Sequence, residues 1–246
     1  MEITGKKGKL LKAVIAVLLA AVLGVGFFFW ARYIMTKKAY HTEPVTEETL
    51  LPLGITACNK LMIVAHPDDE TIWGGGHLKE GGYLVVCITN GKNKERKREF
   101  LDAVEMSGNT ALILGYPDKL FGERDDWEKV DSKITDDIGF IMSYKAWDLI
   151  VTHNPDGEYG HIHHKMTSEI VTKVYDRLKP QTALYYFGQY HKAAEMPAQS
   201  DDFSPISEEQ QDFKDRILEC YESQKDTIEK FRHMLPYENW QEYQGR

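Results

Sequence analysis

The stretch LMIVAHPDDETIWGGGHLKEGGYLVVCIT (61–89) contains two short apolar runs separated by a stretch of mixed polarity. The runs LMIVA (61–65) and YLVVCIT (83–89) are predicted to be strands, because they are short and apolar and are bounded by Pro, Gly or Asn. Residues 70–80 are predicted to be a helix. A strand, a helix and a second strand in this order indicate two parallel strands joined by a crossover helix.

The alternation of strand and helix continues along the chain. Apolar runs predict further strands at ALILG (111–115), DLIVT (148–152) and ALYYF (183–187). Amphipathic stretches predict helices at 94–108, 131–145 and 165–179, and a long terminal helix at 208–233. The predicted fold class is therefore α/β, a three-layer sandwich with a mostly parallel sheet and helices on both faces. In such sheets, ligands bind beyond the carboxyl ends of the strands.

The composition is that of a folded protein. The chain has 246 residues, of which 42% are hydrophobic and 28% charged, which fits one medium-sized domain and excludes a disordered chain. Its net charge is −8, but residues 1–38 carry seven basic side chains and one acidic, so the other 208 residues carry −14. An acidic domain without a basic stripe repels phosphate backbones, so we expect no nucleic acid partner.

An unbroken apolar run, AVIAVLLAAVLGVGFFFWA (13–31), lies near the amino terminus. As a helix, its 19 residues would rise about 28 Å, close to the hydrocarbon thickness of a bilayer. We predict a basic segment at 1–12 and a transmembrane anchor at 13–35. A cleaved signal peptide is the alternative, but its apolar core is typically about 7–15 residues long and is followed by small residues. Here FFFWARYIM follows Gly26, which favours an uncleaved anchor.

The charges beside this run predict how the chain is oriented. Four lysines precede the run and three cations follow it. The positive-inside rule then favours a cytoplasmic amino terminus, a single pass through the cell membrane and an extracytoplasmic domain. Residues 36–57 lack clear periodicity and are predicted to be a stalk, with the folded domain at 58–246.

Two polar segments directly follow predicted strands. AHPDDE (65–70) follows the strand at 61–65, and HNPDGEYGHIHH (153–164) follows the strand at 148–152. Together, His66, Asp69 and His164 are two imidazoles and one carboxylate, which suits Zn²⁺ with a water molecule in the open fourth position. The same set could hold Fe²⁺ or another divalent ion.

The neighbouring side chains suit a hydrolytic reaction at such an ion. Asp68 adjoins Asp69 but would point elsewhere, so it is free to take a proton from the activated water. His161 or the hydroxyl of Tyr159 could stabilise the charge on an attacked carbonyl oxygen. The alternative is that AHPDDE is a turn with a helix cap and that the histidines are solvated surface. Two such segments, both at strand ends, favour the metal site.

AHPDDE together with HNPDGEYGHIHH resembles the signature of the N-acetylglucosaminyl-phosphatidylinositol de-N-acetylase family, also called PIG-L or LmbE-like. The resemblance covers roughly residues 59–233. It implies a Rossmann-like fold and a zinc-dependent deacetylase that removes acetate from N-acetylglucosamine groups on lipid, thiol-precursor or other glycan carriers. The residues that match the family's motifs imply His66, Asp69 and His164 as metal ligands, Asp68 as general base, His161 and Tyr159 as groups that polarise or protonate the tetrahedral intermediate, and Arg96, three residues before Glu99, as a sugar contact.

The chain departs from the family pattern at three positions. Ile162 and His163 replace the Pro and Asp of the usual GHPDH, so a carboxylate that could orient a ligand imidazole is missing. His163 could compete as a metal ligand, but we expect it to be a solvated neighbour, because residues i and i+3 share a helix face and i+2 does not. Tyr221 stands where a His is usual, and His77 is expected on a helix surface.

The sequence therefore predicts a membrane-anchored, zinc-dependent hydrolase that removes the acetyl group from an N-acetylglucosamine-type glycan or glycolipid. Two alternatives remain open. One is an inactive anchored domain that binds glycan through the same cleft. The other is a different metal-dependent amidase or an O-deacetylase on the same site. The carrier of the sugar is not predicted.

Overall fold

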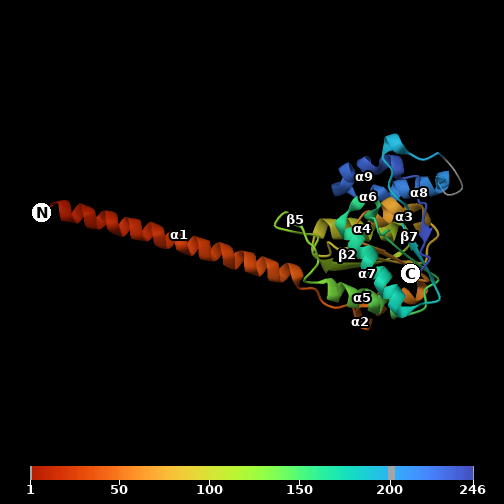
Figure 1. Cartoon of the computed structure of the whole chain (residues 1–246), viewed down its shortest axis with the longest axis horizontal. Coiled ribbons are helices and arrows are strands. Elements are labelled where there is room, and N and C mark those ends of the chain that lie inside the picture. The colour runs from red at the N-terminus through yellow and green to blue at the C-terminus, as the bar shows by residue number, and fades with distance from the viewer. Residues whose placement is uncertain (1, 199–202, 246) are drawn as a thin grey trace. The chain divides into compact units, whose positions relative to one another are not determined.

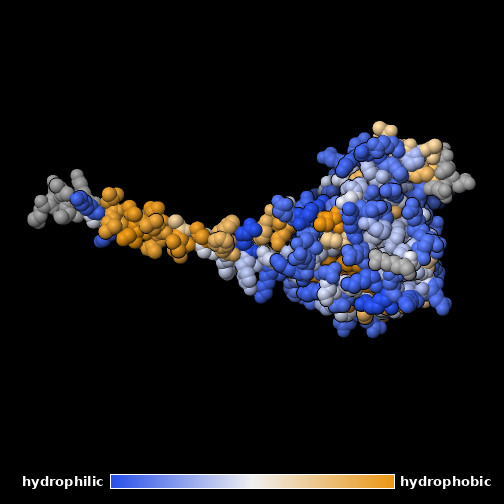
Figure 2. Space-filling model, in the orientation of Figure 1, coloured by the Kyte–Doolittle hydropathy of each residue, from blue (hydrophilic) through white to orange (hydrophobic). Residues whose placement is uncertain are grey.

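The structure is a computed structural model that describes residues 2–198 and 203–245. It divides into two units at residue 41, and each is described by itself. The first unit is the helix α1 (Glu2–Tyr40). Residues 7–40 of this helix are unburied, and the helix is long and apolar enough to cross a membrane or to be a signal sequence. Figure 2 shows the continuous apolar surface over its middle.

The second unit is built on a mostly parallel sheet. Within the described residues its order is β3-β2-β1-β6-β7-β8, and every neighbouring pair is parallel except β7 and β8. The strands are β1 (Lys60–Val64), β2 (Tyr83–Thr89), β3 (Thr110–Tyr116), β6 (Leu149–Thr152), β7 (Ala183–Tyr186) and β8 (Gln241–Glu242). The strand order reverses beside β1, which places a crevice beyond the carboxyl ends of β1 and β6.

Helices cover both faces of this sheet (Figure 1). One face carries α3 (Asp69–Leu78), α4 (Lys94–Met106) and α8 (Glu208–Leu218), and the other carries α5 (Asp131–Ser143) and α7 (Ile162–Leu178). All seven residues of β2 are buried, as expected for a strand covered on both sides. The predicted α/β sandwich is confirmed.

The folded unit begins before the predicted boundary at residue 58. Residues 42–57, expected to lie in a stalk, form α2 (Glu47–Leu50) and two 3₁₀ turns. Val45, Leu50 and Ile55 are buried, and the backbone N–H of Val45 donates to Asp137 Oδ1 at 2.8 Å. The apolar residues of this segment lie in short turns, so they show no helical or strand period in the sequence.

The long terminal helix predicted at 208–233 was wrong. Helix α8 ends at Leu218, a 3₁₀ turn spans 222–224, and α9 (Lys225–Phe231) follows. Tyr221 is fully buried and its hydroxyl donates to Glu70 Oε1 at 2.5 Å. The backbone N–H and hydroxyl of Ser223 both donate to Glu99. These tertiary hydrogen bonds stabilise the break in the helix, and tertiary contacts of this kind override the helix propensity of the sequence.

A short hairpin and a one-turn helix complete the unit near the carboxyl ends of the strands. The hairpin is formed by β4 (Lys119–Leu120) and β5 (Glu123–Arg124), which pair antiparallel. The one-turn helix is α6 (Gly157–Gly160). The sequence patterns predicted neither the hairpin nor β8, because two-residue strands carry no periodicity.

Glu238 fixes the C-terminal segment to α8 through a buried ion pair and to α3 through backbone hydrogen bonds. Lys214 Nζ lies 2.7 Å from Glu238 Oε1, and both side chains are fully buried. Glu238 also accepts from the backbone N–H groups of Gly76 and His77. His77, expected on the helix surface, lies instead with Nδ1 2.7 Å from Glu238 Oε2 and stacks on Trp240 at 3.8 Å.

Glu238→Gln is expected to lower the free energy of unfolding by about 3–5 kcal/mol, because the Lys214 ammonium would stay buried without a counter-charge. Burial alone would raise the pKa of Glu238, but Lys214 and His77 lower it to about 2. The carboxylate therefore stabilises the fold above its ordinary pKa of 4.5, and this stabilisation is lost as the pH falls from there toward 2.

Urea unfolding of the full chain, followed by tryptophan fluorescence, measures this effect. The matched control is Glu80→Gln, since Glu80 is paired with Lys60 at 2.8 Å but is 52% exposed. We expect the control to cost less than about 1 kcal/mol. Equal losses of unfolding free energy in the two variants would show that the buried Glu238 pair stabilises the fold no more than the exposed Glu80 pair does.

Candidate metal centre

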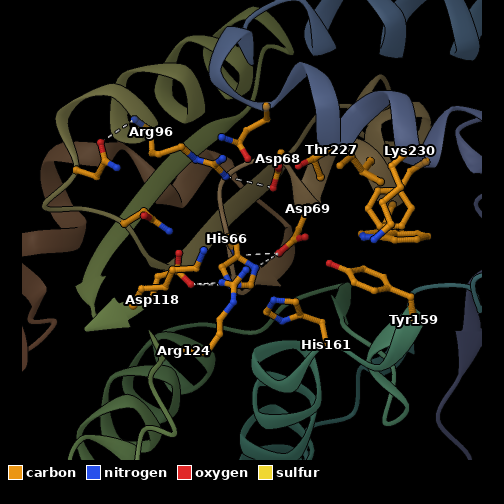
Figure 3. Close-up of a pocket in the computed structure, with 17 residues that line it drawn as sticks. His66, Asp68, Asp69, Arg96, Asp118, Arg124, Tyr159, His161, Thr227 and Lys230 are labelled. Atoms are coloured by element: carbon orange, nitrogen blue, oxygen red, sulfur yellow. Dashed lines mark hydrogen bonds and ion pairs between the residues drawn. The ribbon is translucent and has the colours of Figure 1, made fainter. Parts of the chain in front are cut away.

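A cavity of about 460 Å³ opens beyond the carboxyl ends of the central strands. Its walls come from the start of α3, the start of α4, the β4–β5 hairpin, the segment 159–161 and α9 (Figure 3). The lining includes six of the seven predicted site residues: His66, Asp68, Asp69, Arg96, Tyr159 and His161. The seventh, His164, is fully buried behind this wall.

The first motif forms a tight turn between β1 and α3. The Asp69 carboxylate accepts the backbone N–H of His66 at 2.8 Å, which holds the turn. Asp68 is the N-cap residue of α3, with φ 108° and ψ −29°, yet within the described residues its side chain makes no capping bond. The alternative of a turn with a helix cap therefore accounts for Asp69, which holds the turn, but not for the carboxylate of Asp68. A strained backbone of this kind is typical of functional sites.

The second motif forms α6 and the first turn of α7. Glu158 has φ 53°, and its buried carboxylate lies between two imidazoles. Its Oε2 is 2.5 Å from His164 Nδ1 and 3.0 Å from His153 Nδ1. A carboxylate bound to the second nitrogen of a metal-ligating histidine orients the ring and makes it a better ligand. The sequence indicated no carboxylate that could orient the imidazole of His164, and in the structure Glu158 lies in that position.

The structure brings His66, Asp69 and His164 together. His66 Nδ1 is 3.1 Å from Asp69 Oδ2, and His164 Nε2 is 3.2 Å from Asp69 Oδ1. One ligand atom from each residue lies within 4.8 Å of the others. Apart from this contact with Asp69, His164 Nε2 is a buried nitrogen without a hydrogen-bond partner among the described residues. Two imidazole nitrogens and a carboxylate oxygen this close together fit a divalent cation.

Asp68 and Arg96 lie beside this group. Arg96 Nη2 is 3.4 Å from Asp68 Oδ1 and also donates to the Pro67 carbonyl oxygen. Burial raises the pKa of Asp68 to about 7, against the lowering effect of Arg96 and with a further rise from Asp69. Arg96 is not paired with Glu99, whose carboxylate binds Ser223 instead.

Tyr159 and His161 face the same cavity. The Tyr159 hydroxyl points toward the side of the cavity that holds His66 and Asp69 (Figure 3). His161 Nδ1 accepts the backbone N–H of His163 at 3.2 Å, so the neutral ring carries its proton on Nε2. Burial, together with His66 and His164, lowers the pKa of His161 to about 2, which keeps the ring neutral. It can therefore donate a hydrogen bond from Nε2.

His163 is buried, and the expectation of a solvated neighbour was wrong. Its ring stacks on Trp127 at 4.4 Å, and its Nε2 is 2.8 Å from the Asp125 carbonyl oxygen. Burial and His66 lower its pKa to about 4. The helix-face argument failed because residues 118–127 cover the start of α7 on the side that periodicity would leave to solvent.

Sequence reasoning missed four residues of this site. Two are Glu158 and His153, which lie inside the second motif. The others are Asp118 and Arg124, an ion pair at the β4–β5 hairpin, with Asp118 Oδ1 3.6 Å from His66 Nε2. Asp118 offered the same signal as the first motif, since the sequence Pro-Asp directly follows a strand. Glu158 gave no signal, because its role depends on the turn in α6.

The chain matches the family model described as PIG-L, GlcNAc-PI de-N-acetylase, over residues 61–175. This confirms the resemblance predicted from the two motifs. The chain is also 31% identical over 146 residues to an uncharacterized protein of Acanthamoeba polyphaga mimivirus. That match covers 52% of this chain and spans 62% of the relative's length.

Two solved structures share the fold. An N,N'-diacetylchitobiose deacetylase from Pyrococcus horikoshii, in complex with an inhibitor, has a TM-score of 0.55 at 16% identity and covers 82% of this chain and 94% of its own. The zinc-inhibited form of a teicoplanin deacetylase has a TM-score of 0.55 at 16% identity and covers 72% of this chain and 88% of its own. At sequence identities this low, the structural similarity shows a common fold and nothing more.

Proposed function

We propose that this chain, whose residues 61–175 match the PIG-L family model, is a metal-dependent hydrolase that removes the acetyl group from an N-acetylglucosamine-type amino sugar. One observation carries the proposal. His66, Asp69 and His164, from two distant segments, bring two imidazole nitrogens and a carboxylate oxygen within 4.8 Å of one another, beside the Asp68 carboxylate, which makes no capping bond. The names of the family and of the two solved structures, each a deacetylase, support the same activity.

His66, Asp69 and His164 would hold the ion, which we propose to be Zn²⁺, although Fe²⁺ or another divalent ion suits the same donors. When bound, such an ion supplies Lewis acidity, which polarises the amide carbonyl and makes a water molecule more acidic. Glu158 holds His164 in orientation through the 2.5 Å contact at Nδ1. Because these side chains are buried, water reaches the site only from the cavity side.

The remaining residues perform the proton transfers and stabilise charge. Asp68 takes a proton from water as the oxygen attacks the acetyl carbonyl carbon. His161 Nε2–H and the Tyr159 hydroxyl donate to the oxyanion that forms. The C–N bond then breaks, the proton held by Asp68 passes to the leaving nitrogen, and the products are acetate and a free amine.

Arg96 is proposed to contact the sugar. It lines the cavity, and its Nε is buried without a hydrogen-bond partner among the residues that the structure describes. A buried guanidinium donor without a partner favours an acceptor on the ligand, such as a sugar hydroxyl. The cavity volume of about 460 Å³ lies in the range of small-ligand sites.

We further propose that α1 anchors the enzyme at the cell membrane, with a single pass at 13–35 and an extracytoplasmic catalytic domain. A tether raises the local concentration of a membrane-bound substrate, which favours a glycolipid or an envelope glycan. Protease treatment of intact cells that produce the chain with a C-terminal tag would test this. Loss of the tag supports the orientation, and protection until the cells are lysed contradicts it.

Acetate release by the full chain in detergent, loaded with zinc, tests the activity. The substrates are N-acetylglucosamine, N,N'-diacetylchitobiose and an O-acetylated sugar as a comparison. Release from the N-acetylated sugars supports the proposal. Release only from the O-acetylated sugar would indicate an O-deacetylase, and saturable binding of chitobiose without acetate release would indicate a glycan-binding domain.

A further inference from the structure

The role of His163 follows from its hydrogen bonds. Its Nε2 is 2.8 Å from the carbonyl oxygen of Asp125. A carbonyl oxygen can only accept, so Nε2 carries a proton, and in the neutral ring Nδ1 is left with a lone pair. That nitrogen lies 3.0 Å from His66 Nε2. The backbone of the 118–127 segment therefore sets the tautomer of His163, and His163 presents an acceptor to His66.

His66 has two other polar neighbours at Nε2. Arg124 Nη1 is 3.4 Å away and Asp118 Oδ1 is 3.6 Å away. Arg124 is a donor and would favour an unprotonated Nε2, but it is the longer contact and is already bonded to Asp118. Two lone pairs facing each other at 3.0 Å between His163 and His66 would repel. The shorter contact therefore requires the proton of His66 on Nε2.

We propose that His163 is a positioning residue for the metal ligand His66, a role that rests on the proposed metal-dependent function. Its Nδ1 accepts the Nε2–H of His66, which in the neutral ring leaves the lone pair on His66 Nδ1, where an ion held between this nitrogen and Asp69 would bind it. This is the nitrogen that lies 3.1 Å from Asp69 Oδ2, on the side where the ion would be held. His66 and His164 are then each oriented from behind, one by the imidazole of His163 and the other by the carboxylate of Glu158.

Two amide substitutions separate this role from a structural one. In His163→Asn, the amide oxygen can take the place of Nδ1 and accept from His66, but the bond to Asp125 is lost. In His163→Gln, the amide nitrogen can take the place of Nε2 and donate to the Asp125 carbonyl, but the acceptor for His66 is lost. His163→Phe keeps the ring stacked on Trp127 and loses both bonds.

The experiment measures zinc affinity of the full chain in detergent by competition with a chelating dye. Outer-shell partners of ligating histidines are typically worth about 10–100-fold in metal affinity, so we expect losses of this size in His163→Gln and His163→Phe. We expect His163→Asn to retain most of the wild-type affinity. The absorption spectrum of the Co²⁺-loaded protein should change in the same two variants and be preserved in His163→Asn.

Three results would overturn the inference. Wild-type zinc affinity in His163→Gln would show that the contact with His66 does not affect metal binding. If His163→Asn bound zinc as weakly as His163→Gln, the bond to Asp125 would be the one that affects metal binding. Either result, with zinc bound tightly by the wild type, leaves the proposed function standing. A wild-type chain that binds neither zinc nor cobalt overturns both. If His163→Phe fails to fold, the Asn and Gln pair still decides.

Discussion

Asp68→Asn is expected to lower the turnover of acetate release by roughly 10²–10⁴-fold, the usual contribution of a general acid–base group, while the metal stays bound. The Asp68 carboxylate does not cap α3, so the variant removes no capping bond and weakens only the 3.4 Å contact with Arg96. Asn is a better test than Ala, because Asp68 has φ 108° and Asn tolerates positive φ more readily than other side chains.

Turnover and zinc content are measured on the same preparation. Asp156→Asn is the matched control, because Asp156 is an exposed aspartate in the second motif that does not line the cavity. We expect the control to keep its turnover and its zinc. Near-wild-type turnover in Asp68→Asn would refute the role of Asp68 as general base. Loss of zinc in that variant would assign Asp68 to the metal site instead.

The strands β1, β2, β3, β6 and β7 were predictable because each contains a short apolar run. The run at 61–65 corresponds to β1 at Lys60–Val64, and the run at 83–89 is β2 at Tyr83–Thr89. A parallel sheet covered on both faces needs apolar side chains at every position, and this pattern is visible without any tertiary information. The break after Leu218 was not visible, because it depends on bonds from Tyr221 and Ser223 to glutamates more than 120 residues away.

The three predicted ligands were placed together for a similar reason. β1 and β6 are adjacent and parallel, so the segments that follow them leave the sheet at the same edge. A strand-end rule can therefore bring His66 and His164 to one site from the sequence. The same rule does not predict the side chains that contact the ligand histidines on the side away from the ion. Glu158 reaches His164 only because the backbone turns at φ 53°, and His163 is buried only because Trp127 covers it.

His164→Ala is expected to lose the bound metal, and acetate release should fall at least as far as in Asp68→Asn. His164 is the only proposed ligand from the second motif, and among the described residues its Nε2 is a buried nitrogen without a hydrogen bond. Without it, the ion would keep one imidazole and one carboxylate, too few protein ligands for a catalytic zinc site, which usually has three. Metal analysis of the purified chain should show a stoichiometry near one in the wild type and near zero in the variant.

A folding defect could imitate this result, so a second variant separates the two. His164→Phe keeps a ring of similar shape to stack on His153, which lies at 3.9 Å, but has no nitrogen to offer an ion. It should lose zinc as completely as His164→Ala while its circular dichroism stays that of the wild type. Glu158→Gln keeps the ligand and removes the charge behind it, so its zinc affinity should fall by about 10–100-fold instead of vanishing. A wild-type zinc content in His164→Phe would contradict the proposed coordination, because no step of the proposed chemistry survives without an ion held between His66, Asp69 and His164.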